Sequence, residues 1–258
     1  GFDSILGVVN YFYQIPGALE REGAKVYIAS VNPSQTTEFR GEELNKQLDQ
    51  WKAKDGVAKF NLIGHSHGGP TVRYAAATRN DIASVSTMSG THHGSLVADK
   101  ILAGTTPDGS FDKLATGGLQ LIGWLTGNKT YESADLKTAL TALSAQGTAA
   151  FNARFPAGRN AERANGQYFY SYAGNLVKTN GWDVSDALLS VTGEYYGGVA
   201  NDGLVSPAEA TWGKPIKMDL AWNHLDEVNQ VLGILGKGAP DPKAYYVSMA
   251  NRLKWKLL

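Results

Sequence analysis

The sequence contains no cysteine, which excludes disulfide bonds, cysteine nucleophiles and thiolate metal sites. It has no excess of either charge, because 24 Lys and Arg residues balance 24 Asp and Glu residues, so no net field attracts nucleic acid or an anionic surface. No apolar run approaches the roughly 18 residues that span a bilayer. A neutral or interfacial substrate fits this composition better than a charged one.

Strand-like and helix-like segments alternate in the first third of the chain. Residues 25–31 (KVYIASV), 57–64 (VAKFNLIG) and 83–89 (ASVSTMS) are rich in β-branched side chains and predict buried strands. Helices are predicted between them over residues 37–54 and 70–78. This alternation predicts parallel strands with right-handed crossovers, so the expected fold class is α/β, with a mostly parallel central sheet and helices on both faces.

The later part of the chain is predicted to complete one domain of 258 residues. Residues 133–155 carry leucines on one stripe and predict a long helix capped by Ser133. Residues 168–173 (YFYSYA) predict another strand, and residues 242–256 predict a closing helix. No internal repeat or long linker divides the chain.

The sharpest local signal is GHSHG, a GxSxG motif that begins at Gly64 and ends at Gly68. It lies between a predicted strand and a predicted helix, which are the flanks that a nucleophile elbow requires. Both glycines are expected to be sterically necessary, with Ser66 held out above the sheet as nucleophile. The backbone N–H of His67, at the start of the helix, is predicted to be one oxyanion donor. His65 and His67 are interpreted as packing or hydrogen-bonding groups rather than bases, and a chance turn is the alternative interpretation of the motif.

A serine nucleophile needs a histidine base oriented by a carboxylate. In this fold class the order along the chain is nucleophile, acid, histidine, which selects His224, the last of five histidines. Asp202, in VANDGLV, is the favoured acid because it follows a Gly-rich loop and is expected at a strand end. Order alone leaves Asp183, Asp186 and Asp219 as competing acids, and a purely structural His224 stays possible.

Several motifs together resemble a known family. They are GHSHGGP, NDGLV and NHLDEVNQV, with FDSILGV near the start and ANRLK near the end. In this order they resemble the true lipases of Pseudomonas, Burkholderia and Proteus, which are triacylglycerol lipases of the α/β-hydrolase superfamily. The resemblance implies hydrolysis of carboxylic ester bonds of triacylglycerols, with Ser66, Asp202 and His224 as the catalytic triad.

The resemblance also implies a structural calcium ion. The matching positions are Asp183, Asp226 and Gln230 through their side chains and Ile234 through its backbone oxygen. Calcium prefers such oxygen ligands, and an ion at these positions would tie the loop of His224 to the body of the enzyme. From spacing alone, solvated surface carboxylates are the alternative.

The resemblance further implies a helical lid. Residues 114–125 are crowded with apolar side chains and match the lid position, within a lid or cap region of approximately residues 100–155. Such a lid would open at a lipid surface and bury its apolar face there. A helix of the protein core is the alternative interpretation.

Two departures from the family pattern concern stability and the oxyanion hole. Many relatives carry a disulfide near the catalytic acid, which this chain cannot form. Relatives also open with a strand ending in His-Gly and an apolar residue whose N–H is the second oxyanion donor. That donor would lie before Gly1, so we expect the active protein to contain an upstream or cleaved but associated segment.

By resemblance, the protein is expected to be secreted, to act as a monomer on ester substrates at a lipid–water interface, and to fold with a lipase-specific foldase. No nucleic-acid partner is expected. Two other functions stay open. One is a soluble carboxylesterase or polyester depolymerase with the same triad, and the other is a catalytically silent homologue that binds lipid.

Overall fold

The computed structural model describes the chain except for residues 1–3, 6–8, 105–133, 181–182 and 257–258. The predicted lid segment, residues 114–125, lies outside the described residues. Within the described part, no helix is long and apolar enough to cross a membrane.

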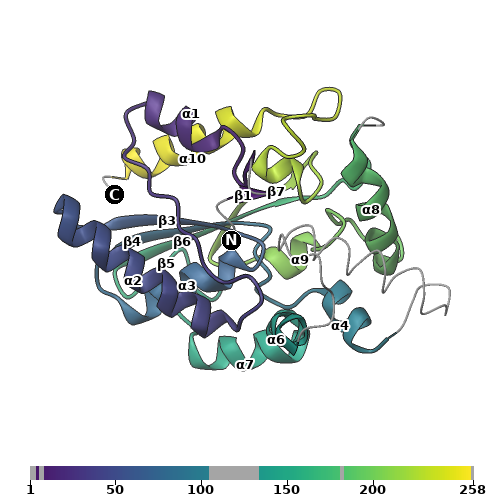
Figure 1. Cartoon of the computed structure of the whole chain (residues 1–258), viewed down its shortest axis with the longest axis horizontal. Coiled ribbons are helices and arrows are strands. Elements are labelled where there is room, and N and C mark those ends of the chain that lie inside the picture. Colours follow the sequence, from purple (N-terminus) through teal and green to yellow (C-terminus); the bar gives the residue numbers. More distant parts are fainter. Residues whose placement is uncertain (1–3, 6–8, 105–133, 181–182, 257–258) are drawn as a thin grey trace.

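The centre of the molecule is a mostly parallel sheet (Figure 1). Strand β3 (Phe60–His65) pairs in parallel with β4 (Ile82–Met88), which pairs with β6 (Gln167–Gly174), which pairs with β7 (Lys214–Leu220). The short β5 (Arg163–Ala164) is antiparallel to the start of β6. A separate antiparallel pair is formed by β1 (Ser4–Ile5) and β2 (Val9–Asn10). The predicted sheet and the strands near residues 57–64, 83–89 and 168–173 are confirmed.

Helices cover both faces of this sheet, as predicted (Figure 1). On one face lie α2 (Thr37–Asp55) and α3 (Gly68–Thr78), and on the other lie α1 (Ile15–Arg21) and α10 (Pro242–Trp255). Each face has its own apolar core, and neighbouring residues of β6 alternate between the two. Phe169 packs with Leu48 of α2, whereas Tyr170 packs with Tyr246 of α10.

Shorter helices surround the carboxyl ends of the strands. They are α4 (Leu96–Leu102), α6 (Ala134–Leu143), α7 (Ala145–Arg154), α8 (Val184–Gly193), α9 (Pro207–Ala210) and the single turns η1 (Glu194–Tyr196) and η2 (Asp226–Val228).

The single long helix predicted for residues 133–155 is wrong, because α6 and α7 are separated at Ser144. This residue has an extended backbone, and its hydroxyl accepts the N–H of Gly147 at 3.0 Å. Serine favours such N-cap positions over helix interiors, so it starts a new helix here.

The strand predicted for residues 25–31 is also wrong. The segment is extended, but side chains of α2 replace the neighbouring strand that it would need. Gln47 accepts the N–H of Ser30 at 3.0 Å and donates to its carbonyl oxygen at 2.6 Å, and Glu43 accepts the N–H of Asn32 at 2.6 Å. The N–H and carbonyl oxygen of Ser30 and the N–H of Asn32 are therefore satisfied without a ladder.

Candidate active site

The GxSxG motif forms a sharp turn between β3 and α3. Ser66 has a φ of 55°, a left-handed conformation that is uncommon for a residue with a side chain and is often retained at functional sites. Its N–H donates to the carbonyl oxygen of Met88 at 3.1 Å, and its own carbonyl oxygen accepts from Gly69 at 2.9 Å and from Thr91 at 3.3 Å. The turn is thus fastened to the end of β4.

The two glycines of the motif are not equivalent, which corrects the expectation that both are sterically necessary. A Cβ atom on Gly64 would lie 2.3 Å from the carbonyl oxygen of Gly68, whereas one on Gly68 would meet nothing within 4 Å. The close approach is between the side of Gly64 and the backbone of Gly68. Only the first glycine is required by packing within the protein.

Asp202 and His224 meet in the protein interior. His224 Nδ1 lies 2.7 Å from Asp202 Oδ2, and both side chains are fully buried. The backbone N–H of His224 also donates to the carbonyl oxygen of Asp202 at 2.9 Å. The other ring nitrogen, Nε2, is buried and has no hydrogen-bond partner among the described residues. The ring is therefore oriented by Asp202, with Nε2 left open.

The sequence predicted that Asp202 lies at a strand end, and this prediction is wrong. It sits in the loop before α9, where its Oδ1 accepts the N–H groups of Leu204 at 2.9 Å and Val205 at 2.8 Å. Burial acts to raise the pKa of Asp202, but His224 and these two N–H groups outweigh it and hold the pKa below its ordinary value. The loop thus stabilises an ionised carboxylate without a strand.

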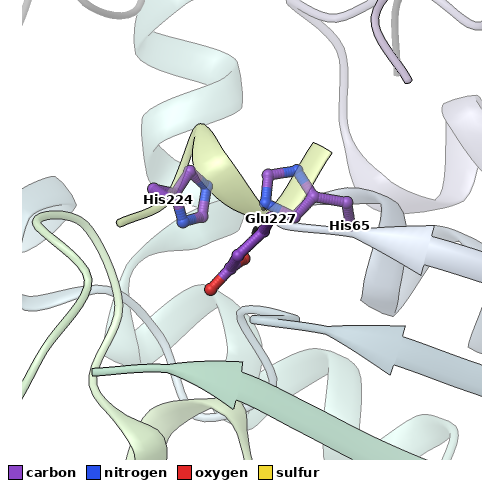
Figure 2. Close-up of side chains that lie close together, drawn as sticks. All are labelled: His65, His224 and Glu227. Atoms are coloured by element: carbon purple, nitrogen blue, oxygen red, sulfur yellow. Dashed lines mark hydrogen bonds and ion pairs between the residues drawn. The ribbon is translucent and has the colours of Figure 1, made fainter. Parts of the chain in front are cut away.

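The ring of His65 connects the elbow to the loop of His224. The two imidazole centroids are 4.4 Å apart, and His65 directly precedes Ser66. His65 Nε2 lies 2.9 Å from Glu227 Oε2, and its Nδ1 lies 2.7 Å from the hydroxyl of Tyr11. Figure 2 shows His65, His224 and Glu227 converging from the end of β3 and from the loop after β7. The serine turn and the histidine loop are therefore neighbours in space.

Glu227 is a second buried carboxyl group beside Asp202. Its Oε1 accepts from the Ser89 hydroxyl at 2.6 Å and from the N–H of Gly174 at 2.8 Å. Burial and the negative charge of Asp202 raise the pKa of Glu227 well above its ordinary value. Glu227 therefore favours its protonated form more than an ordinary glutamate does, whereas Asp202 favours its ionised form.

His65, His224 and Glu227 also carry atom types that bind metals, and these atoms all lie within 4.8 Å of one another. Most of these atoms are engaged by the hydrogen bonds of His224 Nδ1 to Asp202 and of Glu227 to His65 and Ser89, whereas His224 Nε2 has no partner among the described residues. The cluster is best described as a hydrogen-bond network within the site.

His67 bonds to a group outside the Asp202–His224 pair, in line with the packing or hydrogen-bonding role predicted for it. His67 is 2.9 Å from the hydroxyl of Thr37. As the N-cap residue of α3, it places its backbone N–H near the positive end of that helix.

Asp219, one of the competing acids, is exposed and paired with Lys217 at 2.8 Å.

Comparisons with known proteins agree with this geometry. The family described as alpha/beta hydrolase fold matches residues 4–186. The triacylglycerol lipase of Vibrio cholerae is 41% identical over 267 residues, covering 98% of this chain and 84% of the relative. Those of Burkholderia plantarii and Pseudomonas fragi are 34% and 31% identical, each over 98% of this chain, covering 83% and 92% of their own lengths.

The chain belongs to the bacterial triacylglycerol lipase family. Solved structures agree at the level of the fold. Lipase 1 from Pelosinus fermentans matches with a TM-score of 0.70 at 16% identity, over 98% of this chain and 96% of its own. Staphylococcus hyicus lipase matches with a TM-score of 0.65 at 19% identity, over 98% and 93%. The α/β-hydrolase fold predicted from the sequence is confirmed.

In this lipase-family chain, two further carboxylates named from the sequence lie near the histidine loop. Asp183 is the N-cap of α8, and its Oδ1 accepts the N–H of Ser185 at 2.8 Å. Asp226 starts η2, and its Oδ2 accepts the N–H of Asn223 at 3.1 Å. The second oxygen of each carboxylate, Asp183 Oδ2 and Asp226 Oδ1, is buried without a hydrogen-bond partner among the described residues.

Sequence reasoning missed three contributors to the site. Glu227 lies three residues after His224 in the NHLDEVNQV motif, and that proximity was an available signal. Asn223 lies three residues before Asp226, a spacing typical of a capping box. Tyr11 carries no local signal, because only the fold brings it to His65.

The steric difference between the two glycines generates a test of the elbow. We expect Gly64→Ala to lower stability by about 1–3 kcal/mol through overpacking against backbone. Gly68→Ala has open space and replaces glycine by a better helix former, so stability is expected to stay equal or to rise. Thermal unfolding of both variants measures this. Equal destabilisation by the two substitutions would contradict the described turn.

Proposed function

We propose that this chain is a triacylglycerol lipase that hydrolyses carboxylic esters through an acyl-enzyme on Ser66. The observation that carries the proposal is the buried Asp202–His224 hydrogen bond beside the Ser66 turn. A strained serine next to an oriented imidazole is the arrangement that nucleophilic ester cleavage requires. The relatives that share the chain almost end to end carry the name triacylglycerol lipase.

In the proposed reaction, the hydroxyl oxygen of Ser66 attacks the ester carbonyl carbon while His224 Nε2 takes the hydroxyl proton. The hydrogen bond from Nδ1–H to Asp202 stabilises the imidazolium that forms. The N–H of His67 stabilises the developing oxyanion. The imidazolium then protonates the leaving alcohol, and water, deprotonated by His224, releases the fatty acid and regenerates Ser66.

The opposite pKa shifts of Glu227 and Asp202 support this assignment of His224 as base. The lowered pKa of Asp202 makes this carboxylate the counter-charge for the imidazolium. His65 is neutral, because burial and the neighbouring charge of His224 lower its pKa well below the ordinary value. Both ring nitrogens of His65 are already hydrogen-bonded, to Tyr11 and to Glu227, so His65 does not compete with His224 as the base for Ser66.

Activity measurements on three variants test the mechanism. Ser66→Ala removes the nucleophile and is expected to abolish hydrolysis of emulsified triacylglycerol. Asp202→Asn is expected to lower kcat by about 10⁴, because the neutral amide neither fixes the tautomer nor stabilises the imidazolium. Asp219→Asn, at an exposed acid, is the matched control and should retain wild-type kcat.

The same measurements separate the alternatives. Hydrolysis of soluble short esters without hydrolysis of the emulsion would identify a carboxylesterase. Absence of ester hydrolysis by the wild type would favour a catalytically silent lipid-binding protein. Full activity of Asp202→Asn would refute the proposed acid.

A structural calcium ion is the second part of the proposal. The orphaned oxygens of Asp183 and Asp226 fit a hard cation, which would be held by these two carboxylates with Gln230 and the backbone oxygen of Ile234. Burial, together with the charges of Asp183 and Asp186, raises the pKa of Asp226 to about 7. Such a group favours binding a positive charge. When bound, calcium would neutralise these carboxylates and stabilise the fold around His224.

Calcium removal has an expected dependence on pH. Without the ion, Asp226 is protonated more readily when folded than when unfolded, where its pKa is 3.8. Its contribution to stability is therefore present below that value and lost as pH rises through about 7. We expect excess chelator to lower the melting temperature most near and above neutral pH.

Unfolding curves with calcium and with chelator, from mildly acidic to mildly basic pH, measure this effect. Asp183→Asn should lose most of the response to calcium, whereas Asp219→Asn should keep it. Identical melting with calcium and with chelator across the range would remove the ion from the proposal. Secretion, a foldase partner and a monomeric state belong to the proposal through family resemblance.

A further inference from the structure

Asn223, the residue before the proposed catalytic base, closes a turn around His224. Its side-chain Oδ1 accepts the N–H groups of Leu225 and Asp226, both at 2.8 Å. In return, Asp226 Oδ2 accepts the N–H of Asn223 at 3.1 Å. This reciprocal pattern has the bonding of a capping box and closes the turn that precedes η2, with His224 inside it. The backbone of the base is thus held from both sides of the turn.

The other end of the Asn223 amide points to α8. Its Nδ2 donates to Asp186 Oδ1 at 2.9 Å and to the hydroxyl of Ser185 at 3.3 Å. The orientation of the amide is unambiguous, because only its oxygen can accept the two backbone N–H groups of the turn. Asn223 is fully buried, so water does not replace these bonds.

Asp186 is a fixed anchor for this contact. Its Oδ2 accepts the N–H groups of Thr179 and Asn180, both at 2.8 Å, and the Thr179 hydroxyl reaches its Oδ1 at 3.3 Å. The carboxylate is therefore tied to the loop before α8 as well as to the helix that carries it. A bond from Asn223 to Asp186 connects the histidine turn to α8 and to the loop before it.

This connection uses none of the atoms that would bind calcium. The two oxygens of Asp226 have different surroundings. Oδ2 accepts the N–H of Asn223, whereas Oδ1 has no hydrogen-bond partner among the described residues. Asp183 Oδ1 accepts the N–H of Ser185 at 2.8 Å, and the Asn223 side chain also bonds to this carboxylate and acts to lower its pKa. The hydrogen bond from Asn223 to Asp186 is a second connection to α8, and neither of its atoms belongs to a proposed calcium ligand.

We propose that Asn223 is a positioning residue for His224 and that it acts by tying the histidine turn to Asp186, independently of calcium. The proposal rests on the proposed function, in which His224 is the base. Because a displacement of about 1 Å at a catalytic group can cost about 10²-fold in rate, a single lost tie at this turn has a large expected effect.

An exchange of the two side-chain types tests this tie. Asn223→Asp places two carboxylate oxygens against each other. Asp186→Asn keeps an oxygen for Thr179 and Asn180 but turns its NH₂ group against that of Asn223. The combined variant N223D/D186N restores one donor and one acceptor with the total charge unchanged. Both single variants should therefore lose kcat in the same way, and the combined variant should recover it.

Three measurements compare the variants with the wild type, in saturating calcium and below the melting temperature of each protein. The first is kcat and KM on a soluble ester, where each single variant should lose up to about 10²-fold in kcat with little change in KM. The second is the melting temperature. The third is the far-downfield proton resonance of His224 Nδ1–H bonded to Asp202, which should broaden or shift in the single variants and return in the combined variant.

Asn152→Ala is the matched control. Asn152 is also a buried amide that links two segments, through Arg73 at 2.9 Å and the carbonyl oxygen of His92 at 2.7 Å. It should lower the melting temperature while keeping kcat and the His224 resonance. Wild-type kcat in Asn223→Asp, or a combined variant no better than the worse single one, would overturn the proposal. If the wild type hydrolyses no ester, the proposed function fails, while the resonance still decides whether Asn223 positions His224.

Discussion

The buried charge of Asp202 is the constraint on which the site depends. A carboxylate without solvent is costly unless donors surround it. Here the donors are two N–H groups of its own loop and Nδ1 of His224, and the backbone N–H of His224 donates to the same residue. These bonds fix the ring orientation, so Nε2 is the ring nitrogen left for the proposed activation of Ser66.

One consequence is that other carboxyl groups nearby cannot also be ionised without compensation. Burial and the charge of Asp202 raise the pKa of Glu227 well above its ordinary value, so a proton is the compensation favoured there. Farther out, Asp183 and Asp226 each have one oxygen without a hydrogen-bond partner among the described residues, where a cation is the proposed compensation.

The features that sequence reasoning predicted are those encoded locally or by chain order. The apolar repeats of α2 and α10, the elbow at Gly64 and the nucleophile–acid–histidine order needed no knowledge of tertiary contacts. The failures depend on such contacts. Residues 25–31 have strand composition, yet Gln47 occupies the backbone groups that a strand would use. The raised pKa of Glu227 depends on burial beside another acid, which no spacing in the sequence reveals.

The most direct test of the account is the intact mass of the wild type before and after incubation with an alkyl phosphonate ester, compared with Ser66→Ala. Such reagents form a stable bond only with an activated serine. We expect one adduct on the wild type and none on the variant. An unlabelled wild type, or equal labelling of the two proteins, would contradict the claim that Asp202 and His224 activate Ser66.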